Sequence, residues 1–159
     1  MSLERRFSVN GTGKEDASLQ ERHLKADQAL ARKYDQLAEK LAAVEKYLRS
    51  LHLPQPIYVS YNESELDPMI HGRVPYNWDC LAFRRHQGKW RLCHAKCNSA
   101  QCEDGTEPSW KPLVECATDV RLEAIAQLGK LKIEAAKSKE EYVAKVDEAL
   151  GEIDNFVSD

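Results

Sequence analysis

An uninterrupted heptad pattern of apolar residues runs through the first half of this chain and constrains its fold more than any other feature. The spacing alternates between four and three residues, as in the a/d seam of a coiled-coil helix. The seam consists of Leu30, Tyr34, Leu37, Leu41, Val44, Leu48 and Leu51. We expect a helix with such a seam to pair with another helix, so the pattern predicts architecture and says nothing about chemistry.

The seam belongs to a helix that we predict over residues 18–52. Ser18 and Glu21 have the spacing of a capping box at its start, and Pro54 cannot continue its hydrogen-bond ladder. Residues 1–17 are polar and contain Gly11 and Gly13, and we expect them to form a disordered tail.

A second long helix is predicted over residues 117–159, with Thr118 as a plausible N-cap. Two lysines interrupt its seam, which holds Ile125, Leu128, Ala135, Tyr142, Val146, Ala149, Ile153 and Phe156. A further capping-box pattern begins at Ser138. A single helix and a helix kinked or split near Ser138 are therefore both compatible with the sequence.

The segment between the helices, residues 53–116, predicts a small β module. Residues 57–61 alternate and are rich in β formers, and residues 78–86 and 89–96 flank Gln87-Gly88, a hairpin signal. Closure at that turn places Phe83 opposite Leu92 and Ala82 opposite Cys93. One face, taken as the core, then holds Leu81, Phe83, Trp90 and Leu92, and the other holds Cys80, Ala82, Arg84, Arg91 and Cys93. Residues 62–77 and 98–112 contain prolines and glycines and are read as loops.

These segments predict an α+β fold in one structural domain. We expect the two long helices to form an antiparallel coiled-coil-like hairpin, with the small antiparallel β module (a hairpin plus one strand) inserted between them. The alternative is that the seam over residues 30–51 pairs with the same seam of a second chain. The sequence does not separate the two arrangements, and both can hold.

The five cysteines raise the question of a metal site. Cys93, Cys97, Cys102 and Cys116, with His94 among them, have the residue types that bind zinc. They lack the two-residue spacing between cysteines that marks structural zinc sites, so small reduced thiols are the favoured interpretation, and we expect no metal or other cofactor. A disulfide from Cys93 or Cys97 to Cys102 is a further alternative.

A basic and aromatic hairpin is the second candidate site. Residues 71–97 hold six lysines and arginines against one aspartate, so their net charge is 6 − 1 = +5. Cations interleaved with aromatic rings suit single-stranded nucleic acid or another anionic ligand. The residues in question are Trp78, Arg84, Arg85, Lys89, Trp90 and Arg91. The alternative is that Trp90 belongs to the core and that nearby carboxylates pair with the arginines.

Composition limits the function classes further. The net charge of −3 and the pI of about 6.0 argue against wholesale binding to nucleic acid or acidic membranes. No apolar run is long enough for a membrane span, and residues 1–14 have no signal-peptide core, so we expect a cytoplasmic protein.

No catalytic motif is visible. The sequence favours a non-catalytic interaction or scaffolding protein, self-associating through its seams, most simply as a homodimer; the alternative is an anionic-ligand binder.

Overall fold

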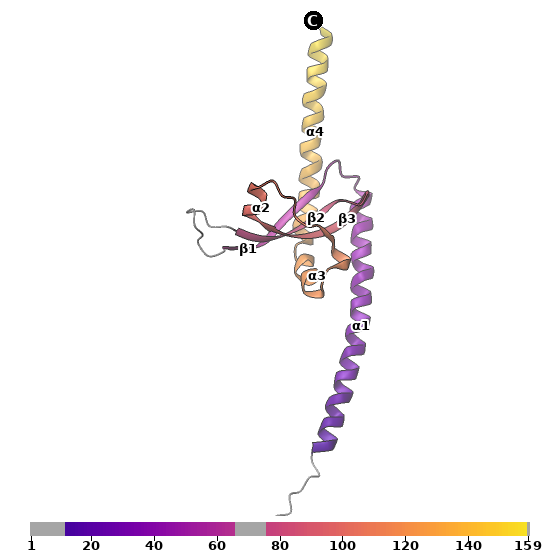
Figure 1. Ribbon diagram of the computed structural model, residues 1–159. Helices are drawn as coiled ribbons and strands as arrows, with labels where there is room; N and C mark the ends of the chain where they lie inside the picture. Colours follow the sequence, from indigo (N-terminus) through magenta and orange to yellow (C-terminus); the bar gives the residue numbers. More distant parts are fainter. Residues whose placement is uncertain (1–11, 66–75, 159) are drawn as a thin grey trace, which may run out of the picture. The chain divides into compact units, whose positions relative to one another are not determined.

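The computed structural model describes residues 12–65 and 76–158 of the chain (Figure 1). The fold is mixed, with helices and one four-stranded antiparallel sheet. The chain divides into two compact units, residues 1–42 and residues 43–159. The first unit holds most of the N-terminal helix, and the second holds its last two turns, the sheet and the other helices.

Helix α1 spans Thr12–Ser50. It begins six residues before the predicted N-cap Ser18, so that residue lies inside the helix, and residues 1–11 of the predicted tail lie outside the described part. The helix ends where His52 takes a left-handed conformation, with φ of 47°. Along the predicted seam, Leu30 and Tyr34 are exposed, whereas Leu41 and Leu48 are buried.

The sheet has the order β1-β2-β3-β4 and is antiparallel throughout. Its strands are β1 (Ile57–Glu65), β2 (Tyr76–His86), β3 (Lys89–Asn98) and the short β4 (Lys111–Pro112). The predicted hairpin register is confirmed, because Phe83 pairs with Leu92 and Ala82 with Cys93. Positive φ values at Gln87 (49°) and Gly88 (80°) give the left-handed turn that suits a two-residue hairpin loop.

Both faces of the central hairpin are buried. On one face Leu81, Phe83 and Leu92 are at most 1% exposed, and Trp90 stacks on Phe83 with ring centroids 5.3 Å apart. The opposite face carries a cluster of small residues that packs against two tryptophans; it holds Cys80, Ala95, Cys97, Trp78 and Trp110. The hairpin is therefore the core of the second unit.

Residues 98–112 are more structured than the loop that the sequence predicts. Asn98 accepts a hydrogen bond from the Ala100 amide and caps the short helix α2 (Ser99–Glu103). After a turn at Gly105, β4 adds to the free edge of β3, pairing Pro112 with Cys93 and Lys111 with His94. The 3-10 helix η1 (Leu113–Glu115) follows.

The C-terminal segment is divided earlier than the sequence indicates. It forms α3 (Thr118–Ile125) and α4 (Leu128–Ser158), so the break lies at Ala126-Gln127 and α4 continues through Ser138. Leu131, Ala135 and Ser138 are buried where α4 packs against β1. None of the helices in the described part combines the length and hydrophobicity needed to cross a bilayer.

Candidate functional site

Most of the predicted basic and aromatic residues make contacts inside the fold. Arg91 pairs with Glu45, and Arg84 lies 4.6 Å from the Trp110 ring centroid and 3.5 Å from a Glu107 carboxylate oxygen. Trp90 stacks on the core, as described above, and Arg85 lies over its ring at 5.9 Å. Trp78 packs against the cysteine-containing face. Arg85 and Lys89 are exposed at the hairpin end, and Arg73, one of the six cations counted over residues 71–97, lies outside the described residues.

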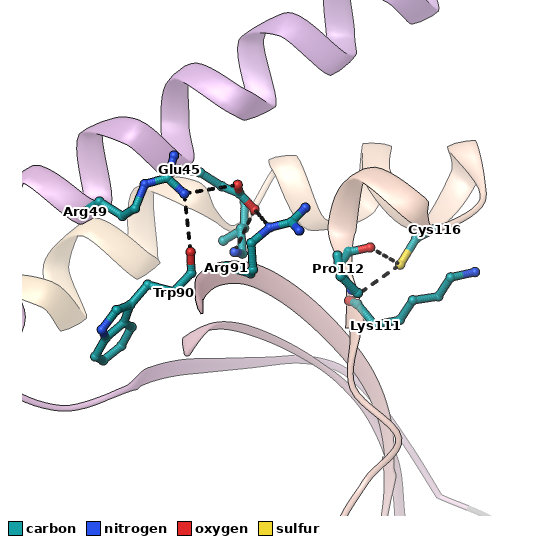
Figure 2. Close-up of polar contacts among 8 residues, drawn as sticks. Glu45, Arg49, Trp90, Arg91, Lys111, Pro112 and Cys116 are labelled. Atoms are coloured by element: carbon teal, nitrogen blue, oxygen red, sulfur yellow. Dashed lines mark hydrogen bonds and ion pairs between the residues drawn. The ribbon is translucent and has the colours of Figure 1, made fainter. Parts of the chain in front are cut away.

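Glu45 connects the end of α1 to the edge of the sheet (Figure 2). One carboxylate oxygen accepts from the Leu92 amide at 3.0 Å and from the Arg91 guanidinium at 3.1 Å, and the other lies 3.6 Å from Arg49. Arg49 also donates to the Trp90 carbonyl at 3.3 Å. Glu45 and Arg49 of α1 thus form hydrogen bonds with backbone groups of β3, next to the part of β3 that pairs with β4. These bonds protect the β3 edge from pairing with other strands.

The four cysteines considered as candidate metal ligands do not come together. Cys93, Cys97 and Cys116 are buried, and Cys102 is exposed on α2. Within residues 12–65 and 76–158, no group of three or more cysteine, histidine or acidic side chains could hold a metal ion. The Cys116 thiol instead donates to the Pro112 carbonyl at 3.4 Å (Figure 2). All five cysteines are free thiols.

Burial holds the inner thiols in their protonated form. It raises the pKa of Cys80 to about 12 and that of Cys93 to about 11, and it raises the pKa of Cys97 and Cys116 as well. Because the thiolate is the nucleophile, these four groups are poorly suited to covalent catalysis at neutral pH.

We expect Cys102 alone to react quickly with an aromatic disulfide reagent in the native protein. It is exposed, whereas the four buried thiols should react at least about 100-fold more slowly, through opening of the fold. Stopped-flow absorbance should show a fast phase of one thiol per chain and five thiols after denaturation. Cys102→Ser should remove the fast phase, and a fast phase of two or more thiols would contradict the burial described here.

A polar network that the sequence did not reveal joins β1, β2, β3 and α3. The imidazole Nε2 of His94 lies 2.8 Å from Asp79, and the Asn62 amide donates to Asp79 at 3.1 Å and to Glu123 at 2.8 Å. Asn62 reaches both carboxylates because it sits at a bulge with φ of 53°. His94 and Cys116 line one open cavity of about 350 Å³, where burial raises the pKa of the Cys116 thiol and the thiol donates to the Pro112 carbonyl, so its thiolate form is disfavoured. The network serves to hold α3 on the sheet.

A further surface feature is an exposed apolar ridge on α4. The stripe that is buried at Leu131, Ala135 and Ser138 continues along the helix, yet every residue from Lys139 to Ser158 is exposed. We define the α4 ridge as Tyr142, Val143, Val146, Ala149, Leu150, Ile153, Phe156 and Val157. Phe156 is 85% exposed and Ile153 is 57% exposed. Figure 1 shows α4 continuing past the sheet in this region.

Comparison with protein-family models, with curated proteins and with solved structures gave no match for this chain. A functional assignment therefore depends on the geometry described above.

Proposed function

We propose that this protein is a non-catalytic interaction or scaffolding protein that self-associates through the α4 ridge. The supporting observation is the exposure of all eight ridge side chains, which form a continuous apolar stripe. Exposed patches of this kind on soluble proteins mark interaction sites. Burying the stripe would contribute about 25 cal/mol for each Å² of apolar surface removed from water.

The helical conformation of the ridge segment supports the same proposal. Residues 139–158 make 20 residues of helix, about 30 Å long, with no buried side chain. Most helical stability in proteins comes from the packing of an apolar face, which this segment of α4 lacks, and Gly151 lowers its stability by up to about 1 kcal/mol. A partner that covers the ridge would supply the missing stabilisation.

The antiparallel helical hairpin predicted from the sequence would use the same ridge in a different way. It would lay the α1 seam on the α4 ridge within one chain, so the ridge would not be available to a second copy. Self-association through the ridge instead doubles the mass in solution, and the doubling depends on the ridge side chains. Molecular masses of the wild type and of a ridge variant therefore separate the two arrangements.

We expect Val146→Asp to weaken self-association at least about tenfold, because it places a charge at the centre of the ridge. Sedimentation equilibrium of the wild type and the variant measures this change. Ala144→Asp is the matched control: it introduces the same side chain on the opposite side of α4, and the mass should not change. Equal masses for Val146→Asp and the wild type would refute self-association through this ridge.

A further inference from the structure

The exposed ridge and its flanking charges identify the partner more closely. We propose that the ridge binds α4 of a second copy in the antiparallel direction, about a twofold axis between the levels of Asp147 and Glu148. This inference rests on the proposed function and specifies its geometry. It follows from the heptad positions of the exposed residues and from the charges beside them.

The ridge has regular coiled-coil spacing. Val146 and Ile153 occupy a positions, and Tyr142, Ala149 and Phe156 occupy d positions. Pairing about the proposed axis places Val146 against Ala149 of the partner subunit and Tyr142 against Ile153 of the partner subunit. Large side chains then face smaller or branched ones, as a packed interface requires.

The flanking charges select the antiparallel direction. The g positions beside the ridge hold Lys145 and Glu152, one turn on either side of the axis. In the antiparallel pair, Lys145 faces Glu152 of the partner subunit, and twofold symmetry produces this opposite-charge pair twice. In a parallel pair, Lys145 would instead face Leu150 of the partner subunit, and no charge would find its complement.

Lys139 gives an independent indication of direction. It occupies the a position before Tyr142 and is exposed. Antiparallel pairing sets its aliphatic stem and ammonium group against the ring of Phe156 of the partner subunit, which is a favourable contact for a cation. Parallel pairing would set Lys139 against Lys139 of the partner subunit, and like charges in one layer repel.

The second flank is apolar on both helices. Val143, Leu150 and Val157 occupy e positions, and antiparallel pairing brings Val143 against Leu150 of the partner subunit. By contrast, the g positions of the α1 seam hold Lys33, Lys40 and Tyr47, so antiparallel pairing with that seam would place no carboxylate at the g position opposite Lys145. The flanking residues of α4 therefore match those of a second α4 better than they match those of α1.

Charge exchange tests this geometry without disturbing the folded core, because Lys145 and Glu152 are both exposed. We expect Lys145→Glu and Glu152→Lys each to raise the dimer dissociation constant about 3- to 10-fold. The double variant should return it to within about twofold of the wild-type value, because both pairs are restored with their signs reversed. Sedimentation equilibrium measures each constant, and Glu148→Lys, away from the interface, is the control for a glutamate-to-lysine change on α4.

Mixing the two single variants provides a second readout. The Lys145→Glu variant has glutamate at both g positions, and the Glu152→Lys variant has lysine at both. Only antiparallel pairing brings these g positions together, so the mixture should form heterodimers tighter than either homodimer. A dimer that Val146→Asp disrupts but that neither charge variant affects would overturn the antiparallel geometry and leave the proposed function intact. A double variant as weak as the singles would do the same. A wild type that remains monomeric at about 100 µM would overturn both proposals.

Discussion

Replacing Glu45 with alanine should lower the free energy of unfolding by about 2–3 kcal/mol. Glu45 is 6% exposed, and its carboxylate satisfies the Leu92 amide and the partly buried Arg91 guanidinium together. Alanine would leave the Leu92 amide without an acceptor and Arg91 without its counter-ion. Part of the loss would be recovered, because Arg91 is 27% exposed and can turn toward water. Urea unfolding at a fixed protein concentration measures the change.

Two further variants make the Glu45 experiment specific. Glu45→Gln keeps a carbonyl oxygen for the Leu92 amide and removes only the charge, so it should cost about 1 kcal/mol. Glu39→Ala removes an exposed glutamate from the same helix and should change the stability by less than about 0.5 kcal/mol. Equal losses for Glu45→Ala and Glu39→Ala would show that the edge contact does not stabilise the fold.

The folded protein should lose stability as the pH rises above about 9, with Cys80 as a major contributor. In the folded state, burial and, less strongly, the neighbouring Cys97 raise the pKa of Cys80 from 9.0 to about 12. The unfolded chain therefore releases this proton at lower pH than the folded chain does, so alkaline conditions favour unfolding. Cys93, with its pKa raised to about 11, acts in the same direction. Each of these two thiols should cost about 2 kcal/mol between pH 9 and pH 11.

Denaturation with urea between about pH 8 and pH 11, under reducing conditions, follows this loss. Cys80→Ala should make the decline shallower by about 1 kcal/mol per pH unit above pH 9. Cys102→Ala is the matched control: that thiol is exposed, so its removal should leave the slope unchanged. If Cys80→Ala and the wild type decline in parallel, the Cys80 thiol does not keep its proton on folding.

Local sequence signals predicted the elements that depend on short-range chemistry. The Gln87-Gly88 turn and the alternating strands around it define one register, because a shift by one residue would expose the core face that holds Phe83 and Leu92. The helical conformation of residues 18–50 was predicted from its period and its lack of glycine and proline, although α1 starts earlier, at Thr12. Nothing in its period distinguishes a buried seam from an exposed one.

The features that the sequence did not reveal depend on contacts between distant segments. The break at Ala126-Gln127 carries no glycine or proline, and β4 is too short for a periodic signal. Glu45 occupies an ordinary helical position in the sequence, and its role arises only when the β3 edge lies beside it. Likewise, Asp79 and His94 are 15 residues apart and meet because they lie on neighbouring strands.

By itself, the sequence determined where the hairpin and most of the two long helical segments lie, together with the heptad spacing of the α4 ridge. Periodicity and turn chemistry act over a few residues, so they can be read directly from the chain. The tertiary structure alone decided that the α4 stripe is buried through Ser138 and open from Lys139 onward. The sheet covers only the first turns of the helix, and the extent of that cover depends on contacts between α4 and β1, which lie some 70 residues apart in the chain.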